Sequence, residues 1–280
     1  MNKRWKKAVR NVLKYGVILV FLVIFIFPVY WMFVSAFMDN ATLMAWPPQF
    51  NPFRGNLHTF QKLLNMTKYI VFFKNSAVVS LATVAVCLAA SIFAGYSLSR
   101  YRFPGKNAVM TGVLSVQMFP TVAILISLYT FYSQFKLINT YSGLVLADTM
   151  LALPLSIWLL KSFFDTIPRS LDEAARIDGC SRLQTLFLII VPLLKPGLLA
   201  VGIYTFLQSW DDYLFGMIIM NRDSMRTLPV GIAQSFIGEF VHDYSGMMGL
   251  SVITSLPVII LFIFLQKYMI AGLTGGAVKG

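Results

Sequence analysis

The chain has 280 residues, of which 58% are hydrophobic and only 12% are charged, and its mean hydropathy is +0.73. Soluble domains average about 25% charged residues, so this composition excludes an ordinary soluble protein and indicates an integral membrane protein. The net charge of +12 does not indicate a nucleic-acid-binding protein, because the basic residues border apolar segments and form no basic domain.

Six apolar segments are near or above the roughly 20 residues that a helix needs to cross a bilayer. The first runs from Tyr15 to about Phe37, follows a basic segment, and is too long for the core of a cleaved signal peptide. The others are 76–99, 108–132, 143–161, 198–220 and 247–268. The prediction is an all-α, polytopic membrane helical bundle with six transmembrane helices in a single domain, 1–280.

The basic residues predict the orientation of this bundle. With the N-terminus inside the cell, 16 of the 23 Lys and Arg residues fall in cytoplasmic segments. The positive-inside rule therefore places both termini and the polar segment 165–192 in the cytoplasm. Segment 38–75 is then external, with a short surface helix over 56–65, and Gly275 and Gly276 predict a flexible C-terminal tail.

Segment 165–192 has the sequence DTIPRSLDEAARIDGCSRLQTLFLIIVP and predicts two short helices joined by a turn. Ser170 is the expected N-cap of the first helix, and Gly179 ends that helix, since glycine tolerates a left-handed backbone. Ser181 is expected to cap the second helix and Pro192 to close it. Each charged side chain here would cost about 2.5–3.5 kcal/mol at the bilayer centre, so the segment must face water.

This segment resembles the EAA loop of the permease subunits of binding-protein-dependent ABC importers. The matching residues are Glu173-Ala174-Ala175, then Gly179, Ile189 and Pro192, at the family's spacing. The chain has Val191 where the family usually has leucine. Matches to the carbohydrate-type branch are Asn75-Ser76, Gly95-Tyr96-Ser97-Leu98-Ser99-Arg100, Ile167-Pro168, Ala175-Arg176-Ile177-Asp178-Gly179 and the tail Gly272–Gly280.

The resemblance implies an ABC type I importer permease fold, with a cytoplasmic coupling loop at about 165–192. It implies a permease subunit that translocates a carbohydrate across the bacterial cytoplasmic membrane. The implied partners are a second permease subunit, a dimeric ATP-binding subunit, an extracytoplasmic solute-binding protein, the carbohydrate and membrane lipid, and not nucleic acid. The implied ATPase-coupling residues are Glu173, Ala174, Ala175, Arg176, Asp178 and Gly179.

The chain contains no GxxxxGK[ST] phosphate-binding loop, so the energy must come from a partner. We therefore expect no enzymatic activity and no cofactor in this chain, with ATP and Mg bound by the partner ATPase. His58 and His242 have no Cys or carboxylate at ligand spacing, so no metal site is expected.

Polar residues inside the apolar segments are the candidates for lining a substrate pathway, because such groups usually face a bundle interior or a watery cavity. Trp210 and Tyr213 could instead be anchors at the membrane interface. The candidate pathway residues are Gln117, Gln208, Trp210, Asp211 and Tyr213.

Two alternatives remain open. An ABC importer of glycerol-phosphate or another polar solute would share all of these features. A secondary transporter is the alternative from another class, but such proteins commonly show inverted repeats and buried ion-coupling carboxylates. Here the carboxylates lie toward the outer ends of the segments, and nothing mirrors 165–192.

Overall fold

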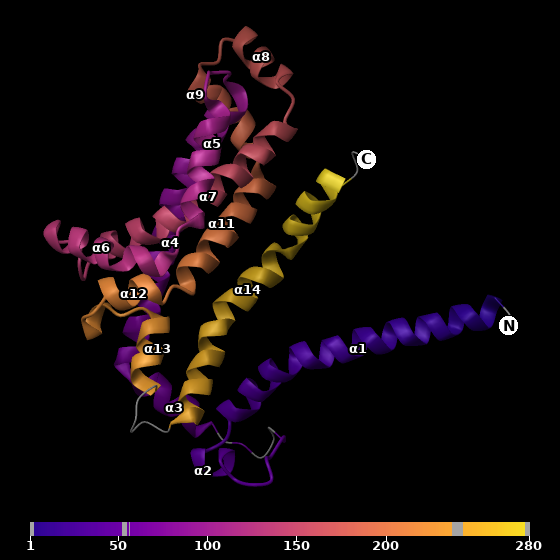
Figure 1. Ribbon diagram of the computed structural model, residues 1–280, viewed down its shortest axis with the longest axis vertical. Helices are drawn as coiled ribbons and strands as arrows, with labels where there is room; N and C mark the ends of the chain where they lie inside the picture. Colours follow the sequence, from indigo (N-terminus) through magenta and orange to yellow (C-terminus); the bar gives the residue numbers. More distant parts are fainter. Residues whose placement is uncertain (1–2, 52–54, 56, 237–242, 278–280) are drawn as a thin grey trace. The chain divides into compact units, whose positions relative to one another are not determined.

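The computed structural model describes residues 3–51, 55, 57–236 and 243–277, and these residues form helices joined by turns (Figure 1). The chain divides into two compact units. The first unit comprises Met1–Thr67 and Ile232–Leu256, and the second comprises Lys68–Gly231 and Pro257–Gly280. Compact units are not the same as separate domains, so the prediction that residues 1–280 form a single domain stays a prediction.

The first unit contains α1 (Lys3–Ala36), α2 (Asn40–Leu43), α3 (His58–Asn65) and the first part of α14 (Tyr244–Ala277). Between residues 10 and 30 every side chain of α1 is exposed although most are apolar. A helix that is apolar on all sides and unpacked is suited to contact with lipid. The helix predicted at 56–65 is present as α3 from His58 to Asn65, while residue 56 lies outside the described part of the chain.

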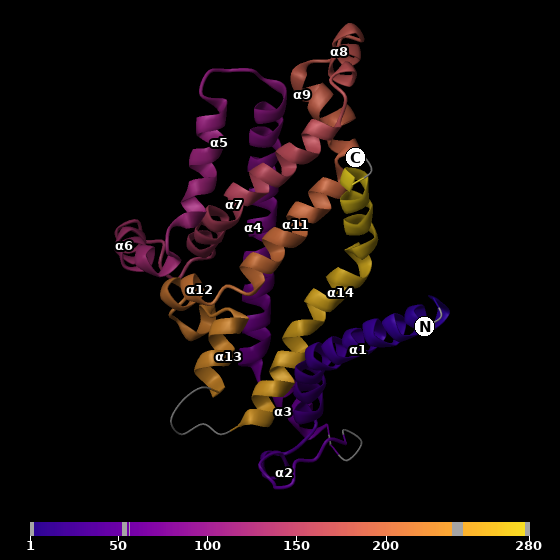
Figure 2. The ribbon, with the colours of Figure 1, turned by 45° about the vertical axis from the view of Figure 1, so that its right-hand side comes forward.

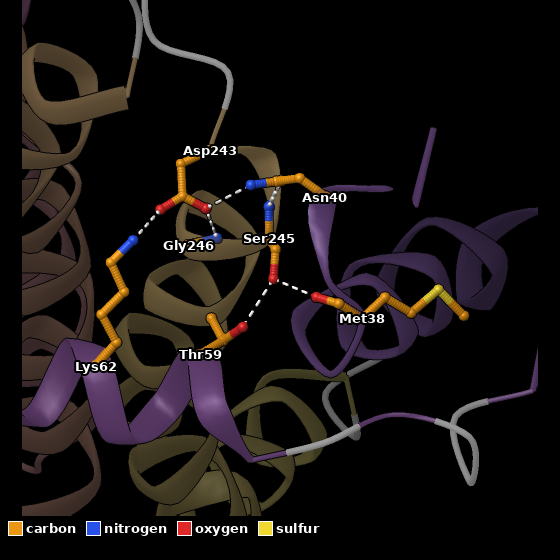
Figure 3. A network of polar contacts seen from close by, with 7 residues as sticks. All are labelled: Met38, Asn40, Thr59, Lys62, Asp243, Ser245 and Gly246. Atoms are coloured by element: carbon orange, nitrogen blue, oxygen red, sulfur yellow. Dashed lines mark hydrogen bonds and ion pairs between the residues drawn. The ribbon is translucent and has the colours of Figure 1, made fainter. Parts of the chain in front are cut away.

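A polar network joins the short helices of the first unit to the start of α14 (Figure 3). Asp243 accepts hydrogen bonds from Lys62 Nζ at 2.9 Å, from Asn40 Nδ2 at 3.1 Å and from the Gly246 N–H at 2.9 Å. Burial alone would raise the pKa of Asp243, but these hydrogen bonds and the Lys62 charge lower it below its ordinary value.

Ser245, in the first turn of α14, completes this network. Its hydroxyl lies 2.8 Å from the Thr59 hydroxyl and donates to the Met38 carbonyl, while its N–H donates to Asn40 Oδ1 at 3.0 Å. Most of these contacts join segments about 180–205 residues apart in sequence. They fix α3 and the end of α1 on the N-terminal turn of α14.

The second unit contains the helices that build the candidate site. They are α4 (Thr67–Arg100), α5 (Lys106–Ser115), α6 (Thr121–Gln134), α7 (Tyr141–Thr166), α8 (Ser170–Ile177), α9 (Arg182–Gln184), α10 (Val191–Leu193), α11 (Lys195–Trp210) and α12 (Leu214–Ile219). The helix α13 (Leu228–Phe236) begins in this unit, and its residues from Ile232 on belong to the first unit. Both views place α8 and α9 at the same end as the C-termini of α4 and α7 (Figure 1, Figure 2).

Among the described residues, four unbroken helices are long and apolar enough to cross a membrane, and two bent helix pairs raise the number to six if each pair is one span. The unbroken spans are Arg10–Ala36, Thr67–Arg100, Tyr141–Thr166 and Tyr244–Phe264. The all-α bundle predicted from composition is therefore confirmed.

Two of the six predicted spans were wrong as continuous helices. Segment 108–132 is broken after Met118 and bends by 94° before Thr121. Pro120 lacks an N–H and forces Phe119 into an extended conformation, with φ −74° and ψ 133°, so the helix cannot continue through them. Segment 198–220 is also divided, because α11 ends at Trp210.

Three boundaries also differ from the predictions. α4 begins at Thr67, so the end of the predicted external segment is helical. α7 extends beyond both ends of 143–161. The prediction of a flexible tail is wrong for residues 272–277, because α14 continues to Ala277, and residues 278–280 lie outside the described part of the chain.

Two apolar clusters hold the second unit together. One lies beside α8 and consists of Tyr96, Leu160, Phe164, Leu186, Ile190, Leu194 and Val201. The other consists of Val79, Leu125, Tyr132, Leu144, Val145, Ala147, Phe215, Ile219 and Met220. Close backbone approach accompanies the first cluster, because a Cβ on Gly95 would lie 3.1 Å from the Lys161 nitrogen. α4 and α7 therefore meet tightly where the polar segment 165–192 begins.

Candidate functional site

The polar segment 165–192, here called the elbow, forms two helices joined by a turn, as predicted. α8 starts at Ser170 and has Asp172 and Glu173 in its first turn, where negative charge favours the helix dipole. The predicted N-cap was wrong by one residue: Arg169 occupies that position and no side chain caps the helix. Gly179 has φ +83°, so the left-handed turn expected after α8 is confirmed.

The second helix of the elbow begins with the predicted cap. Ser181 Oγ accepts from the Gln184 N–H at 3.3 Å, and Gln184 Oε1 accepts from the Ser181 N–H at 2.8 Å, which completes a capping box. The helix continues through a wide π-helical stretch, Thr185–Ile190, which is followed by Val191 and Pro192. Pro192 was predicted to close it, but helical structure continues to Leu193 and bends by 80° into α11.

A buried ion pair fastens α8 to the end of α4. Arg100 Nε lies 2.9 Å from Asp172 Oδ2, and each of the two side chains is only 7% exposed. Tyr96 OH donates to the other carboxylate oxygen of Asp172 at 2.8 Å. In the sequence Asp172 is one of several charges of the elbow, and no local pattern predicts its two partners on α4.

A second set of contacts ties the start of the elbow to the same turn of α4. Ser99 Oγ donates to Asp165 Oδ1 at 2.6 Å, and Lys161 Nζ lies 2.5 Å from Asp165 Oδ2. Arg169 Nη2 donates to the Ser99 carbonyl oxygen at 3.0 Å. With the Asp172 contacts, α8 is held at several points, so a force on α8 would be transmitted to the bundle.

The outer side of α8 and the following turn carry the predicted coupling residues. Glu173, Ala174, Arg176, Asp178 and Gly179 are all exposed, whereas Ala175 is 2% exposed and faces inward. Ile177 is 86% exposed, which is unusual for a large aliphatic side chain on a charged segment. The structure thus presents charged groups and one apolar side chain together on an exposed surface of the elbow.

A cavity of about 400 Å³ lies among α6, α7, α11 and α12. Its lining is Thr121, Leu151, Tyr204, Leu207, Gln208, Asp211, Asp212, Tyr213, Leu214 and Phe215. It brings together three of the predicted pathway residues: Gln208, Asp211 and Tyr213. Gln117 is adjacent, with its Nε2 3.5 Å from the carbonyl oxygen of the lining residue Leu151.

Trp210 is placed differently from the other pathway candidates. It is 4% exposed and stacks on Phe206 with ring centroids 5.2 Å apart, while Phe73 packs against it edge-on at 5.5 Å. Trp210 is not among the residues lining the cavity. The aromatic ring that α11 contributes to the lining is that of Tyr204, six residues before Trp210.

Asp212 was not among the predicted site residues, although it lines the cavity. Its carboxylate accepts from the Phe215 N–H at 3.2 Å and from the Gly216 N–H at 2.7 Å, so it also caps the start of α12. The sequence signal is its spacing: Asp212 stands three and four residues before the two N–H donors at the start of α12, as a capping carboxylate does. Asp211 does not have this spacing to both donors. In the described residues, no group of three or more His, Cys, Asp or Glu side chains could hold a metal ion.

An apolar helical bundle with a polar cavity and an anchored, charged elbow is the architecture of a membrane transport protein. Residues 87–275 match the family model of the binding-protein-dependent transport system inner membrane component, which covers most of the chain. The chain therefore belongs to this family and is a permease of the binding-protein-dependent ABC type, as the EAA resemblance predicted. This membership excludes the secondary-transporter alternative.

Several relatives match along nearly their whole length. The chain is 34% identical to the trehalose/maltose transport system permease protein MalG of Thermococcus litoralis, with 92% of this chain and 93% of that protein covered. It is 33% identical to the inner membrane ABC transporter permease protein YcjP of Escherichia coli, with 98% and 99% covered. It is also 33% identical to the sulfoquinovosyl glycerol transport system permease protein SmoH of Agrobacterium fabrum, with 91% and 89% covered.

A solved structure shares the fold. A chain of a bacterial ABC transporter involved in the import of the acidic polysaccharide alginate matches with a TM-score of 0.84 and 18% identity, covering 96% of this chain and 99% of that one. A second structure of an alginate ABC transporter, in complex with an alginate pentasaccharide-bound periplasmic protein, matches with a TM-score of 0.70 and 13% identity. The importer permease fold expected from the sequence is confirmed.

Proposed function

We propose that this permease imports a carbohydrate, and that the elbow is the part through which an ATP-binding subunit drives it. The observation that carries the proposal is the division of α8 into two sides. Its inner side is fixed to α4 through Asp172, Arg100 and Tyr96, while Glu173 and Arg176 are exposed. A lever needs both a rigid attachment and a free contact surface.

In this proposal the elbow is cytoplasmic and both termini are on the same side. Arg100, Arg102 and Arg169 gather at the elbow end of the second unit, in agreement with the positive-inside rule. The chain itself performs no chemistry, because ATP and Mg are held by a dimeric ATP-binding partner. A second permease subunit completes the pathway, and an extracytoplasmic binding protein delivers the solute.

The cavity favours a neutral carbohydrate over glycerol-phosphate. Its lining contains two carboxylates and no Lys or Arg, so a phosphate group would be repelled there. Tyr204 and Tyr213 offer ring faces to the C–H side of a sugar, and Gln208 and the carboxylates can hydrogen-bond to hydroxyl groups. Of the relatives named above, one is a permease for trehalose or maltose, which are neutral sugars, and another is a permease for sulfoquinovosyl glycerol, a sugar derivative with an anionic sulfonate. The preference for a neutral sugar in this chain therefore rests on the two carboxylates of its own cavity.

Glu173→Ala tests the coupling role. We expect the purified complex to lose most of the ATP hydrolysis that the sugar-loaded binding protein stimulates, because one partner of an intersubunit ion pair is removed at a cost of about 2–5 kcal/mol. Asp223→Asn is the matched control, since it neutralises an exposed carboxylate on the turn before α13. Full stimulation in the Glu173 variant would reject the proposal.

A further inference from the structure

A small second cavity lies between α8 and the end of α4. It has a volume of about 130 Å³ and is lined by Arg100, Arg169, Asp172, Glu173 and Arg176. We call it the arginine cavity. Three guanidinium groups face two carboxylates, and one of those carboxylates, Asp172, is already paired with Arg100. The cavity therefore carries one positive charge in excess.

Arg100 has a buried, unsatisfied donor beside this cavity. Its side chain is 7% exposed, and its Nη2 has no hydrogen-bond partner among the described residues. Buried charged donors are nearly always satisfied in native proteins, by protein, water or a bound group. Nη2 is buried, so Arg100 contributes positive charge to the cavity, and the donors accessible to a ligand are those of the exposed Arg169 and Arg176.

The other two arginines are placed to complete such a site. Arg169 uses Nη2 to hold the Ser99 carbonyl at 3.0 Å, which fixes its guanidinium at the edge of the cavity. Arg176 lies on the exposed side of α8 and lines the cavity. A planar guanidinium presents donors that match the two oxygens of a carboxylate, and two guanidinium groups can share one such group.

We infer that the arginine cavity receives a side-chain carboxylate, from Asp or Glu, of the ATP-binding subunit. The inference rests on the proposed function of the elbow and extends it to the chemistry of the partner. Glu173 reaches outward to a basic group of the ATPase, and the arginine cavity takes an acidic group in return. Two ion pairs of opposite sense would fix the register of α8 on its partner, which a single pair cannot do.

A monoanion fits this cavity better than a phosphate. Counted over the five charged residues of its own lining, the cavity has one excess positive charge, which one carboxylate balances, and the nearby Glu173 repels a doubly charged phosphate more strongly than a carboxylate. A lipid headgroup is the other anionic candidate. The exposed Ile177 and the charged residues around it instead form a surface of the mixed kind found at protein–protein contacts.

Zero-length carbodiimide cross-linking of the complete transporter tests the inference. The reagent activates a carboxylate, and a nearby lysine amine then forms an amide with it. In the Arg176→Lys variant the amine at position 176 is expected to join an Asp or Glu of the ATP-binding subunit, identified by mass spectrometry of the linked peptides. Arg102→Lys is the control, because Arg102 is exposed at the same end of the unit but does not line the cavity.

Salt and affinity give a second readout. Arg176→Gln is expected to raise the dissociation constant of the ATP-binding subunit about tenfold, with a weaker dependence on salt than in the wild type, as for loss of one charge-assisted contact. Arg176→Lys should recover most of the affinity, because it restores the charge.

The outcomes separate this inference from the proposed function. If the wild-type ATP-binding subunit co-purifies and Glu173→Ala uncouples it, but position 176 gives no link to that subunit, the arginine cavity holds no partner carboxylate and only this inference fails. Equal linking from the control position would also overturn it. The transporter can also be reconstituted in vesicles with and without anionic lipid. If binding of the ATP-binding subunit requires the anionic lipid and position 176 forms no link to protein, the cavity holds a lipid headgroup and the inference is rejected.

Discussion

Removing the Asp172 carboxylate should detach the elbow from the bundle. In Asp172→Ala the Arg100 guanidinium, whose side chain is 7% exposed, would be left without its ion-pair partner, and Tyr96 would lose its acceptor. Breaking a buried ion pair by removing one partner costs about 3–5 kcal/mol. The adjacent cavity of about 130 Å³ gives water access to Arg100, so we expect the lower end of that range.

A loss of about 3 kcal/mol shifts the equilibrium between an attached and a detached α8 by roughly a hundredfold. ATP hydrolysis should then no longer respond to the sugar-loaded binding protein, although basal hydrolysis by the ATP-binding subunit continues. The measurement is ATPase activity of the reconstituted complex, with and without the loaded binding protein, together with the thermal unfolding temperature of the permease.

A double-mutant cycle provides the control and the refutation. Asp172→Leu combined with Arg100→Met removes both charges and fills the space with apolar groups, so its thermal stability should exceed that of either single variant, because no uncompensated charge is buried. Tyr96→Phe should cost only about 1 kcal/mol, the net value of one hydrogen bond. If Asp172→Ala unfolds at the wild-type temperature and remains coupled, or if the two charge removals are simply additive, the ion pair does not hold the elbow.

Three further predictions follow from other contacts. In the first unit, the pKa of Asp243 is lowered by folding, so its ionised side chain contributes fully to stability above the pKa of about 3.9 that it has in the unfolded chain, and this contribution is lost as the pH falls below about 4. Amide hydrogen exchange of α3 should therefore accelerate below about pH 4 in the wild type and show no such step in Asp243→Asn. Asp211→Ala and Gln208→Ala should lower uptake of radiolabelled sugar with ATPase assembly unchanged, and wild-type uptake in both would remove the cavity from the pathway. Ser181→Ala should lower stability by about 0.5–2 kcal/mol through loss of the capping box, whereas an unchanged unfolding temperature would show that the cap contributes nothing.

Local signals in the sequence were sufficient for the turn of the elbow and the start of its second helix, but not for the N-cap of α8 or for the end of the second helix. Gly179 follows α8 with φ +83°, a left-handed conformation that glycine adopts without strain. Ser181 and Gln184, three residues apart, form the capping box of the next helix. Both features depend on residues within a few positions of one another. The apolar segments likewise predicted the helices, because hydrophobicity over about 20 residues is enough to require a span.

Contacts between distant segments were beyond the same reasoning. Asp172 meets Tyr96 across 76 positions, and no spacing rule connects a carboxylate on one helix with a hydroxyl on another. A weaker signal was present, because Asp172 and Ala175 share the inward face of α8, and a charge on an inward face requires a partner. Trp210 illustrates the opposite case: its aromatic character suggested a sugar platform, but Phe73 and Phe206 enclose it.

The distribution of polar groups in the second unit separates two tasks. Near the elbow, the buried side chains of Asp172 and Arg100 are paired, and the more exposed Asp165 and Lys161 also pair with each other, which favours rigidity. In the larger cavity, Asp211, Gln208 and Tyr213 are exposed to the cavity or the surface, which leaves their hydrogen-bonding groups available to a solute. α7 and α11 run from one region to the other, so a displacement of the elbow would move the helices that line the cavity. The physical requirement for coupling is therefore met by the helices themselves: a rigid attachment at one end and uncommitted polar groups at the other.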